Sequence, residues 1–198
     1  LEKLDNTFRS AGQLEKSMGY PCYALIPNIG KMSQPELTNY VISKPSSTVS
    51  ESVRTLRTVL KLRPTANGTK PKCVTITSSF PGEGKTTLSI WLARIAAKSG
   101  EKVIVVDGDL RRPNIHRSMN RSNETSLVDY LTGNKELEQV IQKDEASGAH
   151  MIYGRSVPNS ALDLVNSDKS AKLSESLKQV YDLVIIDSPA CLAVSEAR

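Results

Sequence analysis

A strand–loop–helix unit near the middle of the chain constrains the fold more than any other feature of the sequence. The apolar run Cys73–Thr77 precedes the loop Ser78–Thr87, and a second apolar run, Leu88–Ala96, follows it. The loop ends in Gly-Lys-Thr, which is typical of a phosphate-binding P-loop when it lies between a strand and a helix. We therefore expect an α/β protein that binds a nucleotide at this loop.

The residues of the loop suit a phosphate group. Gly82 and Gly84 can adopt backbone angles that turn successive N–H groups into one concavity, at the positive end of the following helix. We expect Lys85 to contact the β- and γ-phosphates of ATP, Thr86 to bind Mg²⁺ and Thr87 to donate to the α-phosphate. The predicted nucleotide-binding residues are Ser79, Pro81, Gly82, Glu83, Gly84, Lys85, Thr86 and Thr87.

One position departs from the P-loop pattern. The pattern begins with a Gly that four residues separate from the Gly-Lys pair, and Ser79 stands there. The loop alone therefore leaves open a second interpretation, a glycine-containing turn that exposes a lysine.

Strands alternate with helices along the chain. Two nearly continuous apolar runs, Lys102–Val106 and Asp182–Ile186, are typical of strands covered on both faces. We predict a P-loop NTPase-like, three-layer α/β/α fold with a mainly parallel sheet. In this single domain we expect an N-terminal segment with a short strand at Cys22–Ile26 (1–27), a loop (28–48), a helix (49–63) and a nucleotide-binding core (72–198). Within the core we expect helices at 126–131, 137–142, 161–165 and 171–181, and a strand at 150–153.

Carboxylates follow two of the predicted strands. Asp107 and Asp109 come directly after one, and Asp187 ends the other as Val-Ile-Ile-Asp. The carboxyl ends of parallel strands meet at one edge of a sheet, so these groups are expected beside the P-loop. Asp187 is expected to hold Mg²⁺ with Thr86. One of the two carboxylates of Asp107 and Asp109 is expected to approach an attacking hydroxyl, and the second to support the metal. Lys85, Asp107 and Asp109 are thus the catalytic candidates, and Thr86, Asp109 and Asp187 the metal ligands.

The segment 50–62 has helical periodicity, with apolar residues at Val53, Leu56 and Leu60 and Ser50 as the expected N-cap. Three charged residues lie on another side of this helix, and the pattern alone favours a solvated face. These residues are Glu51, Arg54 and Arg57.

The net charge of +5 is modest, so it permits an anionic partner without requiring one. Three dispersed cysteines are typical of free thiols in a reducing compartment. The sequence has no apolar run near the ~20 residues that a membrane-spanning helix needs.

Three motifs together resemble the bacterial tyrosine kinases, the cytoplasmic ATPase-like domains of polysaccharide co-polymerases. They are Ser-Ser-Phe-Pro-Gly-Glu-Gly-Lys-Thr-Thr (78–87), Val-Val-Asp-Gly-Asp-Leu-Arg-Arg-Pro (105–113) and Ile-Ile-Asp-Ser-Pro (185–189). In that family the loop commonly begins with Ser, so Ser79 agrees with the resemblance. Glu51, Arg54 and Arg57 are similar to the family's oligomerisation motif, which reverses the preference for a solvated face.

The resemblance implies an autophosphorylating protein-tyrosine kinase that uses ATP and Mg²⁺ in capsule or exopolysaccharide biosynthesis and export. It implies a ring of identical subunits that phosphorylate one another's tail tyrosines, with no nucleic-acid partner. The further partners that it implies are a membrane-spanning co-polymerase domain, in the same or another chain, and a cognate tyrosine phosphatase. The location that it implies is the cytoplasmic face of the bacterial inner membrane.

The chain departs from the family at its C-terminal side. In the family, further strands and a tyrosine-rich tail follow the third motif. We therefore expect a C-terminally truncated domain, and whether this domain is active by itself stays open. The tyrosines form no terminal cluster; they are Tyr20, Tyr23, Tyr40, Tyr130, Tyr153 and Tyr181.

Two other interpretations remain. The domain could bind ATP only to control assembly and so gate polymer export. Alternatively, it could be a septum-site or chromosome-partitioning ATPase, although that group carries a signature Lys where this chain has Phe80.

Overall fold

The fold is built on one mixed β-sheet. The computed structural model describes residues 8, 10–64, 68–157 and 161–194. Within them, five strands pair in the order β1-β5-β2-β4-β3. The strands β1 (Cys73–Ile76), β5 (Leu183–Asp187), β2 (Val103–Asp107) and β4 (His150–Ile152) are parallel, and β3 (Ile141–Lys143) pairs antiparallel to β4. The carboxyl ends of β1, β2 and β5 therefore lie at the same edge.

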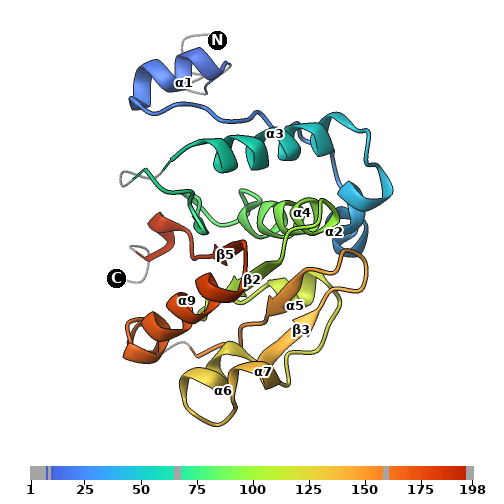
Figure 1. Cartoon of the computed structure of the whole chain (residues 1–198). Coiled ribbons are helices and arrows are strands. Elements are labelled where there is room, and N and C mark those ends of the chain that lie inside the picture. Colours follow the sequence, from blue (N-terminus) through green and yellow to red (C-terminus); the bar gives the residue numbers. More distant parts are fainter. Residues whose placement is uncertain (1–7, 9, 65–67, 158–160, 195–198) are drawn as a thin grey trace.

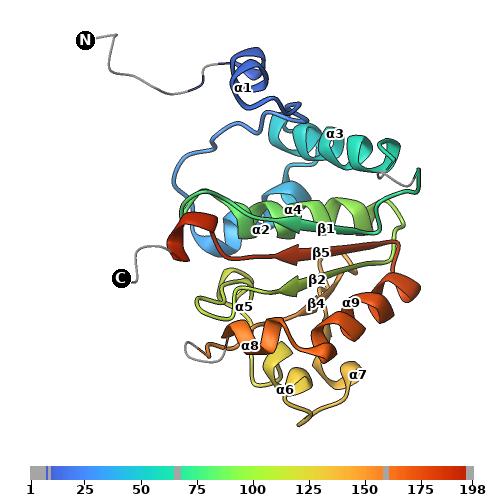
Figure 2. The same ribbon diagram turned by 90° about the vertical axis from the view of Figure 1, so that its left-hand side faces the viewer.

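Helices cover both faces of this sheet (Figures 1 and 2). On one face lie α2 (Gln34–Ser43), α3 (Thr48–Leu62) and α4 (Lys85–Lys98), and α1 (Ala11–Met18) lies beyond α3. On the other face lie α6 (Leu127–Leu131), α7 (Leu137–Val140), α8 (Ala161–Val165) and α9 (Asp168–Val180). The short helices α5 (Ile115–Ser118) and η2 (Cys191–Val194) follow β2 and β5.

Successive residues of the central strands face the two layers in turn. Val103 and Val105 of β2 pack in a core with α3 and α4, while Ile104 packs in a second core with α6 and α9. Each of these three side chains is almost completely buried. Burial on both faces explains why these strands are apolar without alternation. The predicted three-layer fold with a mainly parallel sheet is confirmed.

The N-terminal quarter differs from prediction in two places. The predicted loop 28–48 contains α2, which the capping box of Ser33 and Glu36 begins. This helix was missed because its sequence is polar and only Thr38 and Val41 are buried. The predicted strand Cys22–Ile26 is also wrong, because this segment pairs with no strand among the described residues.

Two element boundaries also differ. The N-cap of α3 is Ser47, three residues before the predicted cap, and its hydroxyl accepts the Ser50 N–H at 3.2 Å. Ser50 is instead buried and donates its hydroxyl to the Lys44 carbonyl at 2.8 Å. The predicted helix 137–142 ends at Val140, and Ile141–Lys143 continues as the edge strand β3.

Buried polar contacts fasten α2 to α4. The Trp91 indole N–H donates to the Leu37 carbonyl at 2.7 Å. Arg94 donates to the Thr38 carbonyl at 2.8 Å and makes two hydrogen bonds to Asp144, at 2.9 and 3.0 Å. Although burial acts to raise it, hydrogen bonds from Arg94 and Ser147 hold the pKa of Asp144 below its usual value. This network fixes α2 beside the carboxyl edge of the sheet.

We expect Arg94→Met to lower the free energy of unfolding by about 3–5 kcal/mol, because Asp144 would remain charged and buried without its partner. The control is Lys178→Met. Lys178 pairs with Glu175, whose side chain is 71% exposed, and its loss should cost at most about 1 kcal/mol. Urea unfolding of both variants measures the difference, and equal losses would contradict this interpretation of the Arg94 network.

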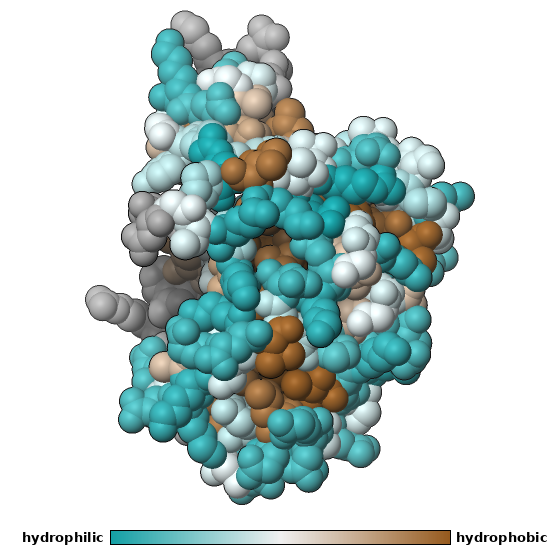
Figure 3. Space-filling view, viewed as in Figure 1, coloured by the Kyte–Doolittle hydropathy of each residue, from teal (hydrophilic) through white to brown (hydrophobic). Residues whose placement is uncertain are grey.

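The surface seen in Figure 3 is mainly hydrophilic, and hydrophobic atoms show there only in small areas. Among the described residues, no helix is both long enough and apolar enough to span a bilayer.

Candidate nucleotide site

The P-loop has the backbone conformation that its glycines predict. Gly82 and Gly84 have φ angles of 86° and 89°, in the left-handed region that other residues adopt rarely. A Cβ atom at either position would meet no atom within 4 Å, so conformation rather than space requires glycine. Gly84 is the N-cap of α4 and supplies no side-chain cap, which leaves the first N–H groups of the helix for an anion.

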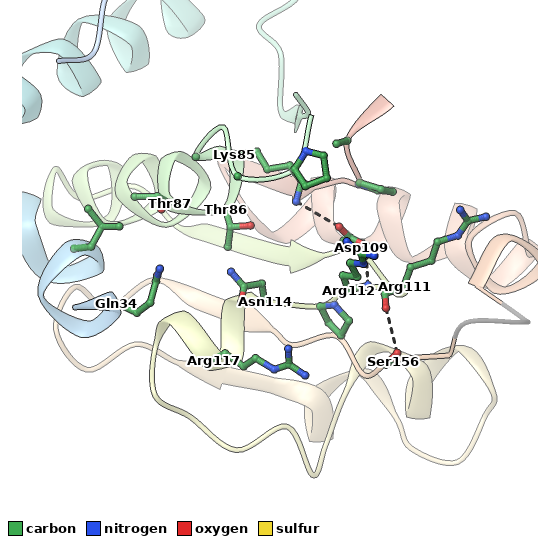
Figure 4. A pocket seen from close by; sticks show the side chains of 17 residues that line it. Gln34, Lys85, Thr86, Thr87, Asp109, Arg111, Arg112, Asn114, Arg117 and Ser156 are labelled. Atoms are coloured by element: carbon green, nitrogen blue, oxygen red, sulfur yellow. Dashed lines mark hydrogen bonds and ion pairs between the residues drawn. The ribbon is translucent and has the colours of Figure 1, made fainter. Parts of the chain in front are cut away.

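A cleft of about 960 Å³ opens in front of the P-loop (Figure 4). One side consists of the P-loop, and the other consists of residues from α2, α5 and the segment after β2. This volume lies at the upper end of the range that small-molecule sites usually occupy. The cleft can therefore hold a nucleotide with room beside it.

Most of the predicted nucleotide-binding residues line this cleft, namely Pro81, Gly82, Gly84, Lys85, Thr86 and Thr87. The other two support the loop from within. The Glu83 carboxylate accepts the Phe80 N–H at 2.9 Å, and the Ser79 carbonyl accepts the Leu192 N–H at 3.1 Å.

Lys85 and Asp109 face each other across the inner end of the cleft (Figure 4). Lys85 Nζ lies 3.4 Å from Asp109 Oδ2, and both side chains are largely buried. The other oxygen, Asp109 Oδ1, accepts the Arg112 N–H at 3.0 Å. The lysine charge is thus held against a carboxylate and positioned for phosphate groups.

Thr86 and Asp187 form a second pair at the start of α4. The Thr86 hydroxyl donates to Asp187 Oδ2 at 2.7 Å, and the Ser89 hydroxyl donates to Oδ1 at 3.4 Å. Burial raises the pKa of Asp187, and the Thr86 hydrogen bond opposes that rise. No group of three His, Cys, Asp or Glu side chains in the described ranges could hold a metal ion alone. The hydroxyl–carboxylate pair fits Mg²⁺, which usually keeps water and phosphate oxygens among its ligands.

Asp107 is completely buried at the end of β2. Its Oδ2 accepts the N–H groups of Asn114 and Ile115, each at 3.1 Å, and its Oδ1 has no hydrogen-bond partner among the described residues. A Cβ atom on Gly154 would lie 2.8 Å from Pro113 Cβ and 3.1 Å from Asp107 Cγ. Gly154 therefore lets the segment 108–114 close over this carboxyl group.

Burial, together with the nearby Asp187 carboxylate, raises the pKa of Asp107 to about 7. Between pH 4 and 7 the folded protein retains a proton on Asp107 that the unfolded chain has lost, so stability falls as pH rises. As the pH rises from 4 to 7, we expect the free energy of unfolding of wild type to fall by about 3 kcal/mol relative to that of Asp107→Asn. Urea unfolding in EDTA at several pH values measures the difference, and a constant difference would contradict the expectation.

Several cleft residues were not predicted from the sequence. Gln34 and Leu37 reach the cleft because α2 lies beside it, and Asn114, Arg117 and Ser156 line its opposite side. The capping box of Ser33 and Glu36, with Pro35 in the first turn, was the available signal for α2.

The residues of the predicted oligomerisation motif lie on α3, away from the cleft. Glu51 and Arg54 pair with each other, and their side chains are 63% and 37% exposed. Arg57 is only 16% exposed and pairs with Glu101 after α4. The structure therefore divides the motif into an exposed pair and an arginine that fastens α3 to its own domain.

Known proteins are similar to this chain in sequence and in fold. Residues 71–197 match the AAA domain family. Tyrosine-protein kinase etk of Escherichia coli K12 is 38% identical over 156 residues, which are 79% of this chain and 21% of that protein. The solved kinase domain of Escherichia coli tyrosine kinase ETK is 33% identical, with a TM-score of 0.81 over 95% of this chain and 76% of that domain. The chain belongs to the bacterial tyrosine kinase family.

The likeness to septum-site proteins is weaker. MinD of Pyrococcus horikoshii, solved with Mg-ADP, is 28% identical, with a TM-score of 0.50 over 60% of this chain and 49% of that one. This kinase-family chain spans about a fifth of the length of the etk protein that it matches.

Proposed function

We propose that this chain is the ATP-binding part of an autophosphorylating protein-tyrosine kinase in capsule or exopolysaccharide biosynthesis and export. The observation that carries the proposal is the convergence of two polar pairs on one P-loop. Lys85, Thr86 and Asp109 line a single cleft. Asp187 of β5 is buried and does not line the cleft, but it accepts a hydrogen bond from the Thr86 hydroxyl at 2.7 Å. The kinase names of the relatives support the reaction.

The residues fit ATP and Mg²⁺ in distinct roles. Lys85 and the N–H groups after Gly84 would bind the β- and γ-phosphates, and Thr87 the α-phosphate. Thr86 and Asp187 would hold Mg²⁺, and Asp109, beside Lys85, would support it. When bound, Mg²⁺ neutralises phosphate charge that these carboxylates would otherwise repel.

The transfer requires a proton acceptor. The tyrosine oxygen forms a bond to the γ-phosphorus, the bond from that phosphorus to the β–γ bridging oxygen breaks, and ADP leaves with the bond's electron pair. We assign the tyrosine proton to Asp107, whose Oδ1 has no partner among the described residues. Because Asp107 is buried, the acceptor can reach it only when the segment 108–114 opens.

Mass spectrometry of a tyrosine peptide incubated with the purified protein and Mg-ATP tests this function. We expect phosphotyrosine that requires both Mg²⁺ and ATP. ATP hydrolysis without phosphotyrosine would contradict the proposal.

The exposed pair on α3 supports self-association as well. We propose that Glu51 and Arg54 contact a neighbouring copy in a ring whose members phosphorylate one another. The second candidate function is a ring of this kind that gates polysaccharide export without transferring phosphate to tyrosine. A membrane-spanning co-polymerase domain and a tyrosine phosphatase would be the other partners, at the cytoplasmic face of the inner membrane.

We expect Arg54→Glu to weaken self-association at least roughly tenfold, because like charges would then meet at the interface. Lys98→Glu, at an exposed lysine in the last turn of α4, is the charge-reversal control. Analytical ultracentrifugation gives the association constants. Equal effects of the two variants, or an association that neither changes, would exclude Arg54 from the contact.

A further inference from the structure

Three arginines line the nucleotide cleft on the side across from the P-loop. Arg111 and Arg112 come from the segment after β2, and Arg117 comes from α5. Arg112 lies beside Asp109, while Arg111 and Arg117 extend to either side of it (Figure 4). We call these three residues the arginine wall. None of their guanidinium groups forms a hydrogen bond or an ion pair within the described part of the chain.

The backbone under the arginine wall is fixed. The Arg112 N–H donates to Asp109 Oδ1 at 3.0 Å, and the Ser156 hydroxyl donates to the Arg111 carbonyl at 3.2 Å. The Val157 N–H donates to the Leu110 carbonyl at 2.9 Å, which ties this segment to the chain after β4. The wall thus combines a held backbone with free charged groups, which lowers the ordering cost of binding an anion.

The charges of the cleft are unbalanced. Its lining includes four cationic side chains and a single carboxylate, Asp109, which is paired with Lys85. Nucleotide phosphates at the P-loop would use Lys85, backbone N–H groups and the metal. The three charges of the arginine wall therefore remain for another ligand.

We propose that the arginine wall binds acidic residues that flank the tyrosine of a protein substrate. This inference rests on the proposed kinase function, since the acceptor must enter the cleft beside Lys85 and Asp109. Arginine forms paired hydrogen bonds with carboxylates, which favours Glu and Asp side chains as the ligands. Gln34 and Leu37 of α2 add a polar and an apolar group to the same cleft.

Peptide binding tests the inference without requiring transfer. Two labelled peptides, Glu-Glu-Tyr-Glu-Glu and Gln-Gln-Tyr-Gln-Gln, are titrated with the protein in saturating Mg-ADP, and fluorescence anisotropy gives each Kd. We expect wild type to prefer the acidic peptide at least roughly tenfold. The variant Arg111→Gln/Arg112→Gln/Arg117→Gln should lose this preference and keep its affinity for Mg-ADP. The control Arg121→Gln, an exposed arginine near α5 that does not line the cleft, should retain the preference.

Two results would overturn the inference. One is equal affinity of wild type for both peptides, which would show that flanking charge is not recognised. The other is a triple variant that keeps the preference but binds Mg-ADP more weakly, which would assign the arginines to the nucleotide. Adding Mg-ATP to matched samples prepared without ADP tests the proposed function separately. Selective peptide binding without phosphotyrosine would reject the kinase function and leave the inference about the arginine wall standing.

Discussion

Lys85→Met should raise the Kd for Mg-ATP at least roughly a hundredfold and abolish phosphotyrosine formation. The substitution removes the charge that we assign to the β- and γ-phosphates. It also leaves Asp109, which pairs with Lys85 at 3.4 Å, as an unbalanced carboxylate in the cleft. That carboxylate would then repel the phosphates, so the loss exceeds that of one contact. Isothermal titration calorimetry measures the affinity.

A lysine of the same helix provides the matched control. Lys98 lies in the last turn of α4, is exposed and does not line the cleft. Lys98→Met should bind Mg-ATP like wild type, and thermal unfolding should show that both variants are folded. An unchanged affinity of folded Lys85→Met would contradict the assignment of the cleft to ATP.

Asp107→Asn should lower kcat for tyrosine phosphorylation at least roughly a hundredfold and change the Kd for Mg-ATP little. Asparagine can still accept the N–H groups of Asn114 and Ile115, which keeps the segment 108–114 in place. It cannot take the proton of the acceptor hydroxyl. Steady-state kinetics together with calorimetry separate the two effects.

Asp109→Asn is the companion variant. It removes a carboxylate that lines the cleft, so it should raise the Mg²⁺ concentration that transfer requires. If Asp107→Asn still phosphorylates tyrosine while Asp109→Asn does not at saturating Mg²⁺, then Asp109 takes the proton and Asp107 only holds the segment 108–114 in place.

The sequence predicted the site better than its surroundings. Asp107, Asp109 and Asp187 were expected beside the P-loop because parallel strands end at a common edge, and β2 and β5 place them there. The sequence did not predict that Asp109 lines the cleft while Asp107 is enclosed. Asp107 is enclosed where Gly154 lies close to Pro113, and these two residues are about 40 positions apart in the chain.

The largest error, the missed helix α2, has a physical cause. Helix α2 depends on tertiary contacts, since Trp91 and Arg94 of α4 hold its backbone carbonyl groups. Its own sequence is polar and has little periodicity, so the pattern predicts a loop where the structure has a helix beside the cleft. The interface role of Arg57 stays a prediction. The fold adds only that this side chain pairs with Glu101 of its own domain.

The most direct test of the proposed function is a time course of phosphotyrosine on an acidic tyrosine peptide, measured by mass spectrometry with purified protein and Mg-ATP. Wild type and Lys98→Met should form phosphotyrosine at similar rates, and Lys85→Met and samples with EDTA should form none. ATP-dependent assembly without phosphotyrosine, or ATP hydrolysis stimulated by DNA or lipid without phosphotyrosine, would contradict the assignment of this cleft to a tyrosine kinase.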